Sequence, residues 1–216
     1  MTLRHLALVV FSATVCLFDI AALADEPAGR AIFDGESFAG WEGNLDWFRV
    51  EDKAVVAGTM KKPIPRNEFL CTEREYGDFE LTLKAKLLGD AANAGIQFRT
   101  KRIPNHHEVS GYQCDMGVVS KDHNIWGALY DESRRRRFLA EPDQAVLAKA
   151  FRPNDWNEFQ IRCEGPRIQI WLNGQQTIDY TESDADIARS GVIALQIHSG
   201  PPSEAWYKDV RIRELK

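Results

Sequence analysis

The chain is poor in cysteine and has no pair of cysteines at the spacing of a zinc site. Four cysteines occur among its 216 residues, and no two of them are separated by only two residues. The adjacent histidines His106 and His107 stand in a polar stretch that contains no cysteine. This absence argues against cysteine or histidine metal ligands, so we expect the cysteines to be structural.

The chain also lacks an excess of positive charge. It has 27 Lys and Arg against 32 Asp and Glu, which gives a formal net charge of −5. A mildly acidic chain is not expected to have nucleic acid as its main partner. Its one strongly basic feature is a run of four arginines at positions 134–137. We expect this short run to lie on a solvated loop, or else to meet an anionic group.

Beyond the N-terminus, no stretch is apolar enough to span a membrane. The first residues combine a basic Arg4, an apolar run over residues 6–17 and a small-x-small site that ends at Ala24. These are the features of a secretory signal peptide. A membrane anchor is the alternative, but the apolar run is short and Asp19 interrupts it. We predict cleavage near Ala24 and export to the periplasm or the extracellular space, without stable membrane insertion.

The predicted boundaries are a signal peptide over residues 1–24 and one domain over residues 25–216. Removing 24 of 216 residues leaves 192, enough for a single domain with a hydrophobic core. Three cysteines remain: Cys71, Cys114 and Cys163. An odd number leaves at least one thiol unpaired. We expect Cys114 to point into the core.

Helical patterns are scarce, whereas short alternating strand patterns are frequent. The clearest strands are predicted over residues 79–87, 158–162, 167–172, 191–197 and 205–213. Asn173-Gly174 between two such runs is a strong hairpin signal. A helix of about two turns is predicted over residues 142–150. The pattern indicates an all-β sandwich or barrel.

Three strand-like runs carry polar residues at alternate positions. Their apolar neighbours, which we expect to face a core, are Ile96 and Phe98, Tyr112 and Cys114, and Leu195 and Ile197. The opposite face would then hold three amides, a guanidinium, a carboxylate and an imidazole: Gln97, Gln113, Gln196, Arg99, Asp115 and His198. Such a face is suited to a sugar. The alternative is a solvated outer sheet face, which antiparallel sheets commonly have.

The longest irregular stretch is expected from residue 118 to about residue 153. It contains an aromatic residue, a phenol and two acids, namely Trp126, Tyr130, Asp131 and Glu132. Long loops in compact domains are often functional, and this one could complete a binding groove. It could equally be an ordinary loop packed by its tyrosine.

Seven segments occur in an order that is typical of one family. They are residues 32–38 with Gly40-Trp41, 76–81, 93–99, 111–113 with Asp115, 126–132, Trp156-Asn157 with 172–174, and 191–198. Together they resemble the 3-keto-disaccharide hydrolase family over residues 31–215. The resemblance implies a concanavalin A-like jelly-roll β-sandwich of two antiparallel sheets, the concave one forming a glycan groove. It also implies export in bacteria that degrade carbohydrates.

A 3-keto sugar is easier to cleave than an ordinary glycoside, because the ketone acidifies the C2 proton. One base can remove that proton, the C1 substituent can leave by β-elimination, and water can add to the enone. His198 is a candidate base because imidazole titrates near neutral pH. Asp115 could orient His198 or act as the base itself. Arg99 could stabilise the enolate.

The remaining candidates would bind the substrate or supply the acid. The amides Gln97, Gln113 and Gln196 could hold hydroxyl groups, and Trp126 could line the groove. The acid could come from the loop residues Tyr130, Asp131 or Glu132. Structural alternatives exist: an Arg99–Asp115 salt bridge, and His198 as the cap of a strand. The sequence does not decide which way Glu108 faces.

The sequence thus leads to the hypothesis of an exported enzyme that cleaves 3-keto-glycosides by elimination and hydration. Laminarinase-like enzymes of this sandwich class carry Glu-x-Asp-x-x-Glu on one strand, whereas this chain has Gln113 before Asp115. The rival is a non-catalytic, lectin-like carbohydrate-binding module. No cofactor is expected, although Asp115, Asp131, Glu132 and His198 could together hold a divalent metal. A sugar oxidoreductase could act upstream and make the ketone.

Overall fold

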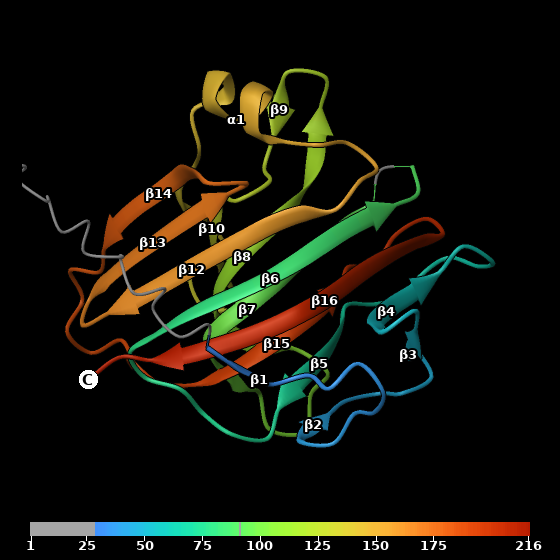
Figure 1. Cartoon of the computed structure of the whole chain (residues 1–216), viewed down its shortest axis with the longest axis horizontal. Coiled ribbons are helices and arrows are strands. Elements are labelled where there is room, and N and C mark those ends of the chain that lie inside the picture. The colour runs from blue at the N-terminus through green and yellow to red at the C-terminus, as the bar shows by residue number, and fades with distance from the viewer. Residues whose placement is uncertain (1–28, 91) are drawn as a thin grey trace, which may run out of the picture.

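Two antiparallel sheets of eight strands each pack face to face in the computed structural model of the chain (Figure 1). The structure describes residues 29–90 and 92–216. The all-β sandwich expected from the sequence is therefore confirmed. The predicted signal peptide over residues 1–24 lies outside the described residues. No helix in the described part of the chain has the length and apolar character that crossing a membrane would require.

The sheet nearer the viewer in Figure 1 is called the front sheet. In spatial order, its strands are β14 (Gln175–Thr181), β13 (Arg167–Leu172), β12 (Asn157–Glu164), β6 (Phe79–Leu88), β16 (Ser203–Glu214), β4 (Ala54–Thr59) and β3 (Phe48–Glu51), and β1 (Arg30–Ala31) also pairs with β16. Segments that are far apart in the sequence thus lie side by side, because β16 pairs with β6 on one side and with β4 on the other.

The other sheet, called the back sheet, carries the polar runs noted in the sequence. In spatial order, its strands are β11 (Phe138–Ala140), β10 (Leu129–Glu132), β8 (Val109–Ser120), β7 (Asn93–Arg102), β15 (Val192–Ile197), β5 (Glu68–Thr72) and β2 (Trp41–Glu42), and β9 (His123–Asn124) pairs with β8. The three predicted runs are therefore neighbours on the central strands β8, β7 and β15.

Local sequence signals act as expected at the hairpin and the helix. Asn173 and Gly174 both have positive φ, at 48° and 79°, and they connect β13 to β14. Helix α1 (Gln144–Ala150) begins after Asp143, whose carboxylate accepts hydrogen bonds from Ala145 N and Val146 N. Both predictions are confirmed.

Apolar side chains from the facing surfaces of the two sheets form the core. Along β6, Phe79, Leu81, Leu83 and Ala85 are buried, as the alternation predicts. From β7 and β8, the rings of Phe98 and Tyr112 stack with centroids 5.8 Å apart. The predicted core-facing residues of β7, β8 and β15 belong to the same cluster: Ile96, Phe98, Tyr112, Cys114, Leu195 and Ile197.

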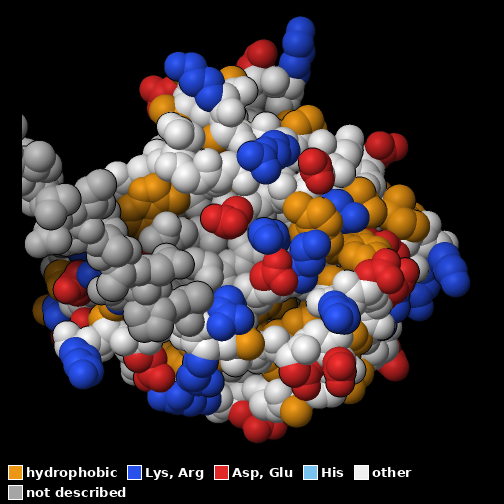
Figure 2. Space-filling view, in the orientation of Figure 1, with side chains coloured by type: hydrophobic (Ala, Val, Ile, Leu, Met, Phe, Trp, Pro, Cys, Tyr) orange, Lys and Arg blue, Asp and Glu red, His pale blue; other side chains and the backbone are white. Residues whose placement is uncertain are grey.

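The outer faces of the two sheets differ. Charged side chains of both signs are intermixed on the outer face of the front sheet (Figure 2), where Lys84 pairs with Asp209 at 3.0 Å. On the back sheet, in contrast, Gln97 and Gln196 are fully buried. That face is therefore not the solvated surface that the alternative interpretation required.

The three cysteines within the described residues are buried and free. Cys71, Cys114 and Cys163 form no disulfide with one another, and Cys114 lies in the core as expected. Burial raises the pKa of the Cys71 and Cys163 thiols to about 12. These thiols stay protonated at neutral pH, which fits structural roles.

The stretch predicted as irregular contains secondary structure that the sequence analysis missed. Residues 129–132 form β10, which pairs with β8 over four residues from Leu129↔Cys114 to Glu132↔Gly111. The strand was missed because its local sequence lacks a clear alternation of apolar and polar residues. As a consequence, Tyr130 and Glu132 face one side of the sheet and Asp131 faces the other.

Candidate active site

A buried polar cluster occupies the outer face of the back sheet. Gln97 lies opposite Gln113, while Gly95 lies opposite both Asp115 on β8 and Gln196 on β15. The four polar side chains alternate with core residues, so they point away from the sandwich interior. Their shared face, predicted from the alternation, is present in the structure.

A chain of hydrogen bonds leads across this face to Asp115. Gln97 Nε2 donates to Gln113 Oε1, and Gln113 Nε2 donates to Asp115 Oδ1 at 3.0 Å. The backbone N–H of Met116 donates to the same oxygen at 3.2 Å. The carboxyl of Asp115 is thereby held in one orientation.

Asp115 is poised to exchange a proton near neutral pH. Its side chain is buried, and burial raises its pKa to about 7. The negative charge of Glu132 also raises this pKa, whereas the hydrogen bonds from Gln113 and Met116 lower it. A carboxyl with a pKa near the working pH is suited to general acid–base catalysis.

Glu132 on β10 lies within electrostatic reach of two further ionisable groups. Burial raises its pKa, the charge of Glu108 raises it further, and His198 lowers it. Gln196 Nε2 donates to Glu132 Oε2 at 3.4 Å. The carboxyls of Asp115 and Glu132 and the imidazole of His198 therefore form one group beside the buried glutamines.

His198 follows β15 directly and is held by two hydrogen bonds. Its backbone N–H donates to Asn93 O at 3.1 Å, and its Nδ1 is 2.7 Å from Ser199 O. Since a carbonyl oxygen only accepts, Nδ1 carries the proton in this arrangement. In the neutral ring Nε2 is then unprotonated, as a base requires.

Glu108 is a site residue that the sequence analysis left undecided. Its Oε1 accepts from Asn67 Nδ2 at 3.3 Å and lies 3.4 Å from His107 Nε2. Its Oε2 is buried and has no hydrogen-bond partner among the described residues. Glu108 precedes β8, so alternation along the strand gave no guide to its direction.

Unpartnered acceptor atoms point to a ligand with hydroxyl groups. In the described part of the chain, Gln97 Oε1, Gln196 Oε1 and Glu108 Oε2 are buried without a hydrogen-bond partner. Leaving such an atom unpaired costs roughly 1–3 kcal/mol. Because protein atoms cover these three oxygens, a sugar hydroxyl would reach them only when the side chains over them move.

Tyr130 lies with the carboxyls, as expected. Its ring packs edge-on against Phe138 with centroids 5.1 Å apart. Burial raises the pKa of its phenol, and the charges of Glu132 and Asp115 raise it further. Tyr130 therefore remains protonated and can donate a hydrogen bond.

Arg99 does not join this cluster, so its predicted place beside Asp115 is wrong. The β7–β8 register shifts between Phe98 and Lys101, and Arg99 has a positive φ of 46°. This bulge turns Arg99 away from the predicted face. Its guanidinium donates to Gly77 O, Gly165 O and Asp78 Oδ1 at 2.9, 2.7 and 2.7 Å. The alternative of an Arg99–Asp115 salt bridge is likewise wrong.

Asp131 is also turned away from the cluster. It is fully buried, and Arg134 and Arg135 bind its carboxylate. Arg135 also binds Glu182 at 2.5 Å. The arginine run at positions 134–137 is thus not simply solvated, since two of its members hold internal carboxylates.

Trp126 packs inside the molecule rather than along the groove. It is buried, and its ring contacts Phe151 and Phe159 at centroid distances of 4.8 and 5.8 Å. Phe159 belongs to the front sheet. The predicted role of Trp126 in binding is therefore not supported by its position.

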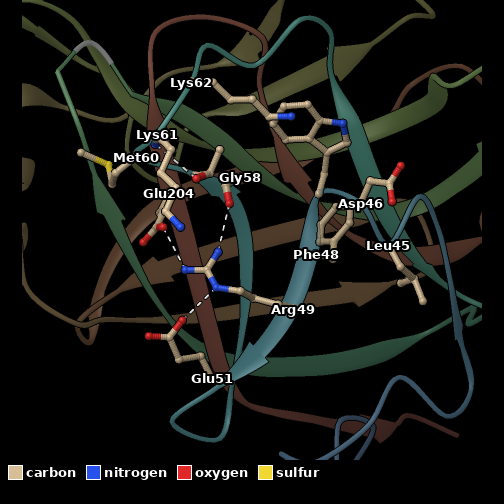
Figure 3. A pocket seen from close by; sticks show the side chains of 12 residues that line it. Leu45, Asp46, Phe48, Arg49, Glu51, Gly58, Met60, Lys61, Lys62 and Glu204 are labelled. Carbon is tan, nitrogen blue, oxygen red and sulfur yellow. Dashed lines mark hydrogen bonds and ion pairs between the residues drawn. The ribbon is translucent and has the colours of Figure 1, made fainter.

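A separate pocket of about 470 Å³ lies at the β3–β4 edge of the front sheet (Figure 3). There Arg49 lies 2.8 Å from Glu51 and 2.9 Å from Glu204, and it donates to Gly58 O. Both carboxylates are therefore paired with the same guanidinium. Among the described residues, no histidine lines this pocket, and its glutamates Glu51 and Glu204 are both paired with Arg49.

Across the described ranges, no group of three or more His, Cys, Asp or Glu side chains is arranged to hold a metal ion. Of the four residues considered for this in the sequence, Asp131 faces the opposite side of the sheet from Glu132.

The family profile described as a 3-keto-alpha-glucoside-1,2-lyase-like domain matches residues 29–213. Among curated proteins, no sequence matches this chain.

Solved structures share the fold. A Parabacteroides distasonis protein whose glycosyl hydrolase assignment is itself provisional has a TM-score of 0.63 at 15% identity, covering 88% of this chain and 94% of that one. The carbohydrate-binding module CBM66 from Bacillus subtilis has a TM-score of 0.58 at 14% identity, with coverages of 81% and 96%. A Bacillus subtilis protein of unknown function with a galectin-like fold has a TM-score of 0.60 at 10% identity, with coverages of 82% and 90%. At these identities the likeness is one of fold.

Proposed function

Because the chain belongs to the 3-keto-alpha-glucoside-1,2-lyase-like family, we propose that it is an exported enzyme that cleaves 3-keto-glycosides on the outer face of the back sheet. The observation that carries the proposal is the buried carboxyl of Asp115, whose pKa is raised to about 7 by burial and by the charge of Glu132. Glu132 in turn interacts electrostatically with His198. The unpartnered amide oxygens of Gln97 and Gln196 on the same face would accept hydrogen bonds from sugar hydroxyls when the side chains over them move.

In the proposed mechanism, His198 Nε2 removes the proton from C2 of the 3-keto sugar. The electrons of the C2–H bond form the enolate, whose oxygen accepts a hydrogen bond from the phenol of Tyr130. With Arg99 bound elsewhere, the protonated phenol of Tyr130 is a neutral donor on this face. Asp115 and His198 could exchange the roles of acid and base.

The enolate then expels the C1 oxygen, which takes a proton from the Asp115 carboxylic acid. The product is an enone, and the leaving group departs as an alcohol. Water adds to C1 of the enone, C2 regains a proton, and the net result is hydrolysis. If water does not add, the reaction ends as elimination, and the lyase-like character of the family supports that outcome.

The second candidate function is carbohydrate binding without catalysis. The fold similarity to CBM66 supports it, because the fold serves binding modules too. Unpartnered amide oxygens would be enough for such a module. It would not need a buried carboxyl that titrates near neutral pH.

The test compares paired glucosides and 3-keto-glucosides as substrates of the purified chain. We expect release of the aglycone from the keto forms alone, with kcat/KM reduced about a hundredfold or more in Asp115→Asn and His198→Ala. Asp179→Asn is the matched control, because this exposed acid pairs with Arg167 on the front sheet.

Saturable binding of unoxidised glycans without turnover would support the binding module instead. Turnover of unoxidised glucosides would contradict the elimination mechanism and would call for an ordinary pair of glycosidase carboxyls. An enzyme specific for 3-keto sugars would depend on an upstream oxidoreductase that oxidises the C3 hydroxyl.

A further inference from the structure

A hollow of about 590 Å³ lies at the edge of the back sheet, beside the candidate active site. Its walls include Phe69 of β5, Arg102 of β7 and the histidines His106 and His107. No residue of this hollow takes part in the proposed proton transfers. Its size is within the range of small-molecule sites in proteins, about 300–1,000 Å³.

Glu108 interacts both with a wall of the hollow and with the acid–base cluster. On one side, its Oε1 lies 3.4 Å from Nε2 of His107, which lines the hollow. On the other side, the charge of Glu108 acts on Glu132. A molecule that contacts Glu132 and extends past Glu108 would therefore enter the hollow.

The fixed charges of the hollow cancel in pairs. Arg102 Nε lies 2.6 Å from Glu42 Oε1, and Arg66 Nε lies 2.9 Å from Glu68 Oε1. Asn44 Nδ2 also donates to Glu68 Oε1 at 3.1 Å. A charged ligand would meet no unpaired countercharge among these groups, whereas a neutral ligand with many hydroxyls would find donors and acceptors already held in position.

Two histidine rings offer a flat surface in the hollow. The rings of His106 and His107 stack with centroids 4.3 Å apart. The first ring is oriented by the backbone N–H of Glu108, which donates to His106 Nδ1 at 3.1 Å. The stacked histidine pair is thus hydrogen-bonded to the backbone of Glu108.

We propose that this hollow is the subsite for the leaving group, and that it takes a neutral sugar. The inference rests on the proposed cleavage of 3-keto-glycosides. It assigns the 3-keto ring to the glutamine and carboxyl face, and the second sugar to the surface beyond Glu108. Glu108 Oε2, which is buried and unpartnered, then accepts a hydroxyl of the bound disaccharide.

The experiment compares two substrates that share the 3-keto-glucose ring. One is methyl 3-keto-glucoside, whose leaving group is too small to reach the hollow, and the other is a 3-keto-disaccharide with glucose as the leaving group. The variant His106→Ala removes one exposed ring of the stacked pair. Lys61→Ala, in the pocket of Figure 3, is the control for a substitution at an unrelated surface hollow.

We expect His106→Ala to raise KM for the disaccharide about tenfold while kcat/KM for the methyl glycoside changes less than about twofold. The control Lys61→Ala should change neither the KM for the disaccharide nor the kcat/KM for the methyl glycoside. Equal losses on both substrates, or no loss on either, would overturn the subsite. Replacing the leaving glucose by glucuronate should lower kcat/KM, and equal turnover of that substrate would contradict the neutral character of the hollow.

Failure of the proposed function gives a different result from failure of the subsite. If the wild-type chain does not cleave even the methyl 3-keto-glucoside, the proposed reaction is wrong and the leaving-group subsite is wrong with it. If it cleaves both substrates and His106→Ala does not discriminate between them, only the subsite is wrong. Retention of the wild-type melting temperature by His106→Ala excludes a folding defect as the cause of either outcome.

Discussion

The side chain of Gln113 lies across the bare α-carbon of Gly95, where an added Cβ would come within 2.4 Å of Gln113 Cδ. Gly95 is flanked by Asp115 on one neighbouring strand and by Gln196 on the other. The absence of a side chain at position 95 lets Gln113 lean toward Asp115 and donate to it at 3.0 Å. A glycine in the middle of a strand thus organises the acid–base cluster.

Replacing Gly95 by alanine should disturb the cluster while leaving the core in place. The new methyl group would displace Gln113, and Asp115 would lose a hydrogen bond that lowers its pKa. We expect kcat/KM to fall about tenfold and the pH at which Asp115 titrates to rise. Overpacking of this kind typically costs 1–3 kcal/mol of stability, so roughly that loss is expected in denaturant unfolding.

The control for this substitution is Gly77→Ala. There an added Cβ would meet only an ordinary contact, 3.9 Å from Arg189 O. If both variants behaved alike in the pH–rate profile, the role assigned to Gly95 would be wrong.

Asp115 should make the protein less stable as the pH rises. Its folded pKa of about 7 lies above the ordinary value of 3.8, because burial disfavours the charged form. The folded state therefore holds this proton more tightly, and its contribution to the free energy of unfolding declines between about pH 4 and pH 7. The decline is on the order of 4 kcal/mol at most, from 1.36 kcal/mol per pKa unit.

Asp115→Asn removes this titration and keeps an oxygen that can accept from Gln113. We expect the variant to be more stable than the wild type above pH 7, although it is inactive. The measurement is urea unfolding at intervals between pH 4 and pH 8. Parallel curves for the two proteins across that range would show that Asp115 does not titrate as described.

Glu182, in contrast to Asp115, should make the protein less stable as the pH falls. Burial opposes its ionisation, but hydrogen bonds from Arg135 and Tyr112 outweigh burial and lower its pKa to about 2. Tyr112 Oη donates to Glu182 Oε2 at 2.7 Å. The stability that this group contributes is present above its ordinary pKa of 4.5 and is lost as the pH falls toward 2.

Glu182→Gln should lower the free energy of unfolding at pH 7 by about 3 kcal/mol, because it leaves Arg135 and Asp131 with an incomplete network. The difference from the wild type should shrink near pH 3. The exposed pair of Arg167 and Asp179 provides the comparison: Asp179→Asn should cost less than about 1 kcal/mol. A constant difference from pH 7 to pH 3 would contradict the assignment.

Arg99 should be important for stability and not for catalysis. Its guanidinium joins the Gly77 and Gly165 carbonyls to Asp78, and all three contacts would be lost in Arg99→Ala. We expect a lower melting temperature, with kcat/KM of the folded protein changed less than about twofold. A selective loss of kcat at unchanged stability would restore the catalytic role that the sequence suggested.

The sequence predicted the site where local alternation was regular. Gln97, Gln113, Asp115 and Gln196 sit on strands whose intervening residues are apolar, so their common face follows from strand geometry alone. The prediction was wrong for Arg99, because a β-bulge changes the side of the sheet that a residue faces. The alternation of apolar and polar residues gives no clear sign of such a bulge. The prediction did not extend to Asp131, since β10 becomes a strand by pairing with β8.

By itself, the sequence determined the all-β class, the turn at Asn173-Gly174, the short helix within residues 142–150 and the inward direction of Cys114, because these depend on residues close together in the chain. Only the tertiary structure decided that the glutamine face is buried, that Glu108 stands beside Glu132, and that Arg99 binds Asp78 instead of Asp115. The reason is physical: burial and charge–charge distance depend on which strands become neighbours. Strand neighbours are chosen by the packing of the whole sandwich.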